Sequence, residues 1–148
     1  MSEEVKLIFP AISAPIKEAE GGKYIWDSLR RKWLSLTPEE WVRRHAVEYL
    51  IAACGYLPEQ IVEEYPVNIN GMAQRADIVV MGRNAKPEVV VECKETNVKL
   101  TVEVVNQVVR YNSVLQCRYV VITNGIDCYC YRHENNSYTP IPNFPKAE

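Results

Sequence analysis

The chain has 148 residues, 47% of them hydrophobic and 24% charged, which fits one globular domain over residues 1–148. A net charge of −2 excludes a protein that coats nucleic acid nonspecifically. Any polyanion would therefore have to bind a local patch of positive charge. No stretch reaches the roughly 20 apolar residues of a membrane span. Because the N-terminus also lacks an apolar signal core, we expect a cytoplasmic protein with five reduced, mostly buried cysteines and no membrane partner.

The first third of the chain predicts an arm, a hairpin and a helix. Prolines and a Gly-Gly pair make residues 1–23 an irregular arm, and residues 24–36 suit a hairpin with basic residues at its tip. Thr37 as N-cap, Pro38 in the first turn and Glu40 at the third helical position predict a helix with a capping box. The helix has an apolar stripe and ends at Gly55.

The rest of the chain predicts five strands and a second helix. The expected elements are strands at 60–69, 75–81 and 88–94, a helix at 100–115, strands at 119–123 and 127–132, and a polar tail at 134–148. Asn70-Gly71 and Asn124-Gly125 mark turns. The order α-β-β-β-α-β-β predicts an α/β fold in which helices flank a central mixed sheet.

Three charged residues lie on strands that otherwise read as buried. Asp77 opens the second strand, and Glu92 and Lys94 close the third. Because side chains alternate along a strand, Glu92 and Lys94 point the same way and Cys93 points the other way. If the two strands pair as a hairpin, Asp77 lies beside Glu92. Two carboxylates suit Mg²⁺, or Mn²⁺ in its place, and a nearby lysine can hold a water for phosphodiester hydrolysis.

Structural alternatives exist for these residues. Glu92 and Lys94 can form a solvated ion pair at a strand end, and Asp77 can pair with Arg75. On steps of about 100° per residue, Glu39 falls on the apolar stripe of the first helix, which makes it the candidate for an auxiliary carboxylate. Its alternative role is to stabilise the positive end of the helix. A basic patch for phosphates, or a solvated turn, is expected from Arg30, Arg31, Lys32, Arg43 and Arg44.

These motifs together resemble the PD-(D/E)XK nuclease superfamily. More closely, the chain is similar to the N-terminal domain family of the type I restriction enzyme restriction subunit. The resemblance covers roughly residues 24–133, and Ala76 stands where the superfamily name has proline. The matching segments are EEWVR (39–43), RADIVV (75–80), VVVECKET (89–96), QVVRY (107–111) and YVVITNG (119–125).

The resemblance implies a restriction-endonuclease-like core and a Mg²⁺-dependent endodeoxyribonuclease without a motor domain. The implied catalytic residues are Asp77, Glu92, Lys94 and Glu39, with the metal held by Asp77, Glu92 and the backbone carbonyl of Cys93. The implied supporting or DNA-binding residues are Gln107, Tyr111, Arg75 and Arg43, although Tyr111 also suits core packing. The expected partners are DNA, a second copy in a homodimer, and a separate motor or specificity subunit. The alternative function is a non-catalytic DNA-binding or assembly module, and an enzyme acting on RNA or nucleotides is a weaker option.

Overall fold

The computed structural model describes residues 5–148. A small sheet has the order β1-β2-β3, and a large sheet has the order β4-β5-β6-β7-β8-β9. Strands β6 and β7 run parallel, whereas every other neighbouring pair is antiparallel. The elements are β1 (Ile16–Ala19), β2 (Gly22–Asp27), β3 (Lys32–Ser35), α1 (Pro38–Ala52), the 3₁₀ helix η2 (Pro58–Gln60), β4 (Ile61–Ile69), β5 (Met72–Met81), β6 (Pro87–Cys93), α2 (Val102–Leu115), β7 (Tyr119–Thr123), β8 (Cys128–Glu134) and β9 (Ser137–Ile141).

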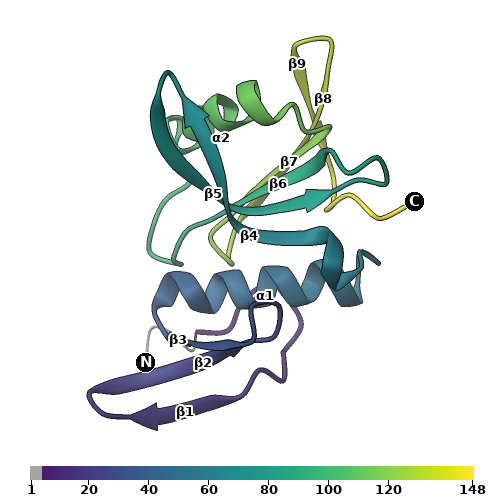
Figure 1. Cartoon of the computed structure of the whole chain (residues 1–148). Helices are drawn as coiled ribbons and strands as arrows, with labels where there is room; N and C mark the ends of the chain where they lie inside the picture. The colour runs from purple at the N-terminus through teal and green to yellow at the C-terminus, as the bar shows by residue number, and fades with distance from the viewer. Residues whose placement is uncertain (1–4) are drawn as a thin grey trace.

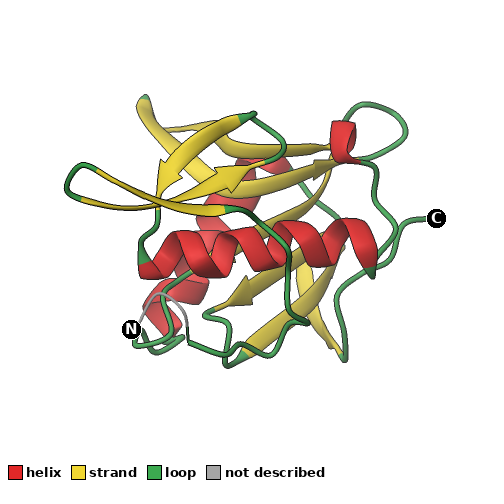
Figure 2. Cartoon of the chain, turned by 90° about the horizontal axis from the view of Figure 1, so that it is seen from below, coloured by secondary structure: helices red, strands yellow, loops and turns green. Residues whose placement is uncertain are grey.

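The expected α-β-β-β-α-β-β order is confirmed, and the architecture is layered. Helix α1 lies between the small sheet and the large sheet, and α2 lies on the opposite side of the large sheet (Figure 1). Seen from below, α1 is the long helix that crosses the middle of the molecule (Figure 2). The fold therefore has a central mixed sheet flanked by helices, as predicted.

The segments that were expected to be an irregular arm and a polar tail both contain strands. The arm at 1–23 includes β1, which pairs with β2, and the tail at 134–148 includes β9, which pairs with β8. Neither strand has a buried face. Each of them therefore forms because its backbone pairs with a neighbouring strand. Asn135 and Asn136 take φ of 51° and 60°, which suits the two-residue turn between β8 and β9. Of the arm, residues 1–4 lie outside the described residues.

Helix α1 begins at its predicted cap. The Thr37 hydroxyl accepts a hydrogen bond from the Glu40 backbone N–H at 3.0 Å, and Pro38 occupies the first turn. The second hydrogen bond of the predicted capping box, from the Thr37 backbone N–H to the Glu40 side chain, was wrong. The Glu40 carboxylate accepts from Arg44 Nε at 2.8 Å instead. Val42 and Leu50 on the apolar stripe are completely buried.

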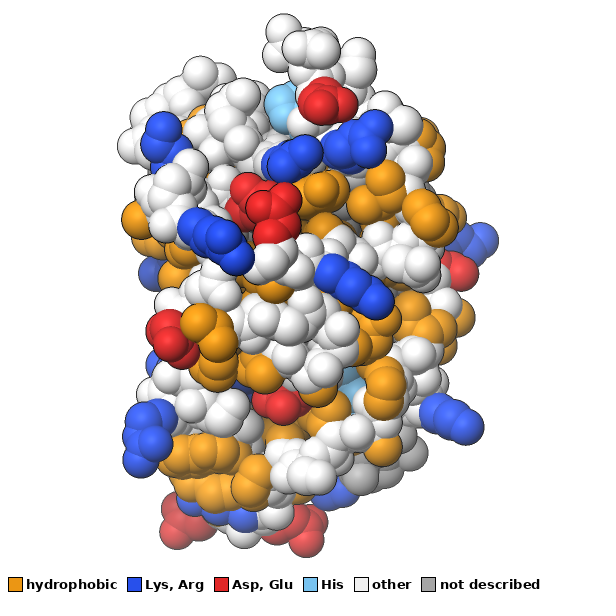
Figure 3. Space-filling view, turned by 90° about the vertical axis from the view of Figure 1, so that its right-hand side faces the viewer, with side chains coloured by type: hydrophobic (Ala, Val, Ile, Leu, Met, Phe, Trp, Pro, Cys, Tyr) orange, Lys and Arg blue, Asp and Glu red, His pale blue; other side chains and the backbone are white. Residues whose placement is uncertain are grey.

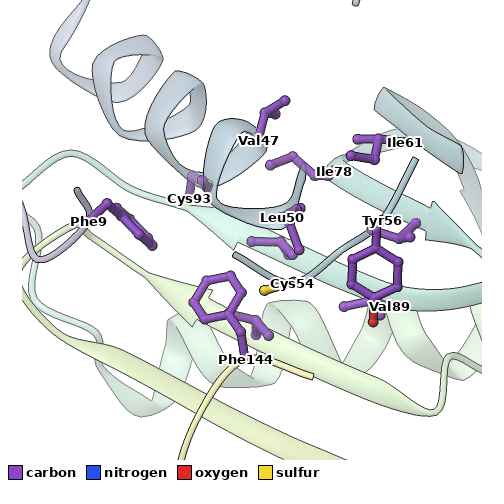
Figure 4. Packing of buried hydrophobic residues seen from close by; sticks show 14 of the residues in the cluster. Phe9, Val47, Leu50, Cys54, Tyr56, Ile61, Ile78, Val89, Cys93 and Phe144 are labelled. Carbon is purple, nitrogen blue, oxygen red and sulfur yellow. The ribbon is translucent and has the colours of Figure 1, made fainter. Parts of the chain in front are cut away.

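The main core lies between α1 and the large sheet. Aliphatic residues of α1 pack against β5 and β6, and aromatic residues from both ends of the chain close the layer (Figure 4). Phe9 from the arm contacts Tyr49 and Phe144 through tilted and edge-on rings. The arm also crosses Gly125, whose φ of 85° and close approach to Leu7 leave no room for a Cβ atom. All five cysteines are free thiols and four of them are buried.

A second apolar cluster lies under α2. Val108, Tyr111 and Leu115 lie on one face of the second helix and are buried against the large sheet. Ala76 of β5 and Val67 of β4 also pack in this cluster. The outer part of the β4–β5 hairpin therefore bends over α2, and this bend sets the position of Asp77.

Candidate active site

Asp77 lies where three strands lose their regular pairing. The ladder between β4 and β5 skips Glu64 and Asp77, and Glu64 has a φ of 52°. The pairing of β5 with β6 ends at Ile78 and Val91. Beyond that point the Asp77 carboxylate accepts the Cys93 backbone N–H through Oδ2 at 2.8 Å. The carboxylate thus replaces a backbone acceptor where the strands separate, so its orientation is tied to the end of β6.

The position of Asp77 within its strand corrects one expectation. Strand β5 begins at Met72, so Asp77 lies inside the strand instead of opening it. Asp77 still lies beside the end of β6, because its Oδ2 accepts the N–H of Cys93, the residue after Glu92, and its negative charge raises the pKa of the Glu92 carboxyl. The hairpin of β5 and β6 therefore brings the two carboxyl groups together as the alternation predicted.

Glu92 and Lys94 point to the same side of β6. Lys94 Nζ lies 3.5 Å from Glu92 Oε2, whereas Cys93 between them is buried in the cluster next to α1. The other carboxylate oxygen, Glu92 Oε1, is buried and has no hydrogen-bond partner among residues 5–148. Burial and then the charge of Asp77 raise the pKa of Glu92 to about 8. Two carboxyl groups therefore share a desolvated space that a cation would stabilise.

The structural alternatives for these residues are partly overturned. Glu92 and Lys94 do form an ion pair, but it lies inside the site and is not a solvated pair at a strand end. Arg75 does not balance Asp77, because its side chain is 71% exposed and pairs with Glu64 at 3.7 Å. The cation beside Asp77 is Arg43, whose Nη2 lies 3.4 Å from Asp77 Oδ1.

Glu39 lies at the rim of the site. Its side chain is 44% exposed, against 10% for Glu40, so the expectation that Glu39 takes the buried direction was wrong. The reason is that Arg44 holds Glu40 inside the protein. Burial and the charge of Asp77 raise the pKa of Glu39, while Arg43 and Lys94 lower it. Glu39 is therefore within electrostatic reach of the same groups as the two inner carboxylates.

Gln107 and Tyr111 approach the site from α2. Gln107 Nε2 donates to the Tyr111 hydroxyl at 3.1 Å, as expected for residues one turn apart. Tyr111 is buried in the core, and its pKa is raised by burial and then by the charges of Glu92 and Asp77. Tyr111 therefore serves packing, and its hydroxyl accepts from Gln107 within the electrostatic reach of the two carboxylates.

The expected basic patch does not form as predicted. Arg30 contacts Asp27 at 2.7 Å, and Arg44 contacts both Asp27 and Glu40 at 2.8 Å. Both arginines also pair with Glu63 of β4. Four residues that the sequence did not mark for this role, Asp27, Glu40, Arg44 and Glu63, thus form a buried ion-pair network. The acidic pair Glu63-Glu64 within an apolar strand was the available sequence signal.

The donor atoms of the site fit a hard divalent cation. In the part of the chain that the structure describes, no three His, Cys, Asp or Glu side chains converge as metal ligands. Two carboxylates do converge, and one of their oxygens, Glu92 Oε1, lacks a partner within residues 5–148. Asp77 Oδ1 makes a long contact with Arg43 at 3.4 Å. Mg²⁺ is usually held by one or two carboxylates with waters completing its shell, so this donor set fits Mg²⁺ or Mn²⁺.

One cavity of the described chain lies away from these carboxylates. A cavity of about 660 Å³ is lined by Gly82 and Glu88 near the start of β6 and by Glu148 at the C-terminus, whereas Glu92 is near the other end of β6. Figure 3 shows the side on which the C-terminus lies, where Lys and Arg side chains are scattered among acidic and apolar ones. This side therefore offers no continuous basic surface.

Comparisons with known proteins identify the family of the chain. The chain belongs to the family described as type I restriction enzyme R protein N terminus, whose model matches residues 38–145. A solved structure, described as that of the type IIG restriction endonuclease BpuSI, matches 67% of this chain at 20% identity with a TM-score of 0.44. The match covers 11% of that longer chain. No curated protein matches at a significant level. No helix among residues 5–148 is long and apolar enough to cross a membrane.

Proposed function

We propose that this domain is a metal-dependent nuclease that hydrolyses DNA phosphodiester bonds. The observation that carries the proposal is the buried Oε1 of Glu92, which has no hydrogen-bond partner among residues 5–148. The same carboxyl group feels the charge of Asp77, and its Oε2 lies 3.5 Å from Lys94 Nζ. A carboxylate pair with a lysine is a suitable set of groups for metal-assisted hydrolysis of a phosphate ester. Membership of a restriction-enzyme family supports DNA as the substrate.

Each residue of the site has a proposed role. Asp77, Glu92 and the backbone carbonyl of Cys93 hold Mg²⁺ or Mn²⁺, which supplies Lewis-acid stabilisation of negative charge on the phosphate. Lys94 holds and orients the attacking water, because its ammonium group lies on the side of the carboxylates. Glu39 at the rim accepts a hydrogen bond or a proton from that water. The enzyme class that we propose is a Mg²⁺-dependent endodeoxyribonuclease, with DNA supported by the family.

The remaining candidates contact DNA or support the site. Tyr111, whose hydroxyl accepts from Gln107, supports the site from α2 within electrostatic reach of the carboxylates. The largely exposed guanidinium of Arg75 can reach a DNA phosphate, and Arg43 Nε is buried without a partner in the described chain. A homodimer would place two such sites on the two strands of a duplex. A separate motor or specificity subunit is a further proposed partner, which rests on the family to which the chain belongs.

A second candidate function is a non-catalytic DNA-binding or assembly module. One observation favours it, namely that no third carboxylate, histidine or cysteine side chain among residues 5–148 completes a metal-binding group. Such a module would bind DNA tightly and with strong dependence on salt, but without turnover. The two functions therefore differ in whether a divalent cation produces cleavage.

The test of the proposed function is a nicking assay. Purified protein is incubated with supercoiled plasmid and with single-stranded circles, in Mg²⁺, Mn²⁺ or EDTA. We expect nicked plasmid with either metal and none with EDTA. DNA binding without nicking in either metal would support the module instead. Equal nicking by an Asp77→Ala variant would identify a contaminant and contradict the proposal.

The carboxyl group of Glu92 predicts a pH dependence of the metal-free protein. The folded pKa of about 8 lies above the ordinary value of 4.5, so the folded state keeps a proton that the unfolded state has released. The free energy of unfolding should therefore fall as pH rises from about 4.5 to about 8. Glu92→Gln should flatten this fall and exceed the wild type in urea midpoint at pH 8, measured in EDTA. A parallel loss in both proteins would contradict the prediction, and the exposed Glu103→Gln is the control.

A further inference from the structure

One buried arginine connects α1 to two other parts of the fold. The Arg44 guanidinium is 3% exposed and contacts Asp27 at the end of β2, Glu40 one turn earlier on α1, and Glu63 on β4. The side chains of Asp27 and Glu63 have no solvent exposure. Burial of so many charges is costly unless the groups are held in fixed positions by one another. The arrangement therefore defines a single geometry for these side chains.

Asp27 is a rigid anchor for this network. Its Oδ1 accepts the backbone N–H groups of Leu29 and Arg30 at 2.9 and 3.1 Å, which ties the carboxylate to the turn between β2 and β3. Burial would raise the pKa of Asp27, but hydrogen bonding to Arg30 and the charge of Arg44 lower it overall, so the group is a carboxylate. The position of Arg44 is thus set by the backbone of the small sheet.

Glu40 carries the connection onward to the site. Its Oε2 accepts from Arg44, and its Oε1 lies 3.7 Å from Arg43 Nη1. Arg43 Nη2 in turn lies 3.4 Å from Asp77 Oδ1 and 3.6 Å from Glu39. Only carboxylates hold the Arg43 guanidinium, since its Nε has no hydrogen-bond partner in the described part of the chain. Arg43 is thus shared between Glu40 on one side and Asp77 and Glu39 on the other.

We propose that Asp27, Arg44, Glu40 and Arg43 form a positioning network that holds the Arg43 guanidinium back from Asp77 and keeps Asp77 Oδ1 available to a divalent cation. The inference rests on the proposed nuclease function. The proposed network makes the β1–β3 sheet part of the site, although Asp27 lies outside the residues 38–145 that match the family. The four residues act through Asp77 and are positioning residues.

The test measures the affinity of the protein for Mn²⁺ alone. Isothermal calorimetry gives the Mn²⁺ dissociation constant of the full chain and of the isosteric variants Glu40→Gln and Asp27→Asn. Glu40→Gln should raise the dissociation constant by about 10–100-fold, the usual effect of losing a residue that orients a metal ligand. Asp27→Asn should cause a smaller rise in the same direction, because it acts through Arg44. In nicking assays, both should raise the Mn²⁺ concentration for half-maximal rate more than they lower the maximal rate.

Glu103→Gln is the control. Glu103 is exposed in the first turn of α2, outside the network formed by Asp27, Arg44, Glu40 and Arg43. We expect its Mn²⁺ dissociation constant to equal that of the wild type. Urea unfolding of every variant shows which proteins remain folded. If Asp27→Asn does not fold, Glu40→Gln decides the result, because its side chain reaches Arg43 directly.

A double-variant cycle separates positioning from a general loss of stability. If Glu40 acts through Arg43, the change Glu40→Gln should have no further effect on Mn²⁺ affinity in an Arg43→Met background. Additive effects would overturn the proposal, and so would a wild-type dissociation constant for Glu40→Gln. Failure of the wild type to bind Mn²⁺ and to nick DNA would instead overturn the proposed function itself.

Discussion

Lys94→Ala is expected to lower the maximal rate of metal-dependent nicking by about 10²–10⁴-fold, the range for a side chain that handles a proton or a water in the transition state. The reason is the position of Lys94, whose ammonium group lies 3.5 Å from Glu92 and has no role as a metal ligand. Removal of a positive charge near the two carboxylates should leave Mn²⁺ binding intact or strengthen it. Single-turnover nicking and calorimetry on the same preparation measure the two quantities.

Two further variants serve as comparisons for Lys94→Ala. Asp77→Asn should lose Mn²⁺ binding together with nicking, because it changes a proposed metal ligand that also accepts the Cys93 N–H. Lys99→Ala removes an exposed lysine from the segment that follows β6 and should keep the wild-type rate. If Lys94→Ala and Lys99→Ala were equally active, Lys94 would have no role in the chemistry. A loss of Mn²⁺ affinity in Lys94→Ala would make it a structural support for the metal site.

Arg44→Met is expected to destabilise the fold by about 3–5 kcal/mol, the usual cost of removing one partner from a buried ion pair. The variant keeps roughly the length of the side chain but removes the positive charge that Asp27 and Glu63 share. Both carboxylates are fully buried, so solvent does not replace that charge. For a domain of this size the loss corresponds to a fall in melting temperature of roughly 6–20 °C. Urea and thermal unfolding, followed by circular dichroism, measure it.

The matched control for this prediction is Arg110→Met. Arg110 is exposed on α2 and lies outside the buried network, so its replacement should change the free energy of unfolding by no more than about 0.5 kcal/mol. Equal stability of the two variants would show that the network is not held together by Arg44. A stable Arg44→Met protein with normal Mn²⁺ affinity would also contradict the positioning role of the network.

Local signals determined most of the elements around the site. The Thr37 cap and the adjacent Pro38 are properties of neighbouring residues, so the start of α1 could be predicted. Asn70-Gly71 specifies a tight turn because both positions have positive φ, and this turn fixes the pairing of β4 with β5. The two-residue period of a strand placed Glu92 and Lys94 on one side with no knowledge of the fold.

Other features followed from contacts that no local pattern contains. Strands β1 and β9 have no buried face of their own, and they exist because β2 and β8 supply hydrogen-bond partners. The helical period favoured Glu39 as the inward carboxylate, yet Arg44 holds Glu40 inside and leaves Glu39 at the rim. A helical wheel ranks directions by hydrophobicity, so it cannot account for a buried arginine that needs an acidic neighbour.

The sequence by itself determined the residue types of the site, the alternation that groups them and the order of the elements. Only the tertiary structure decided that Arg43 and not Arg75 faces Asp77, and that Arg44 lies among buried acids instead of a phosphate-binding patch. The physical reason is that an ion pair depends on distances between side chains that are remote along the chain. The bend of the β4–β5 hairpin and the packing of α1 between two sheets set those distances.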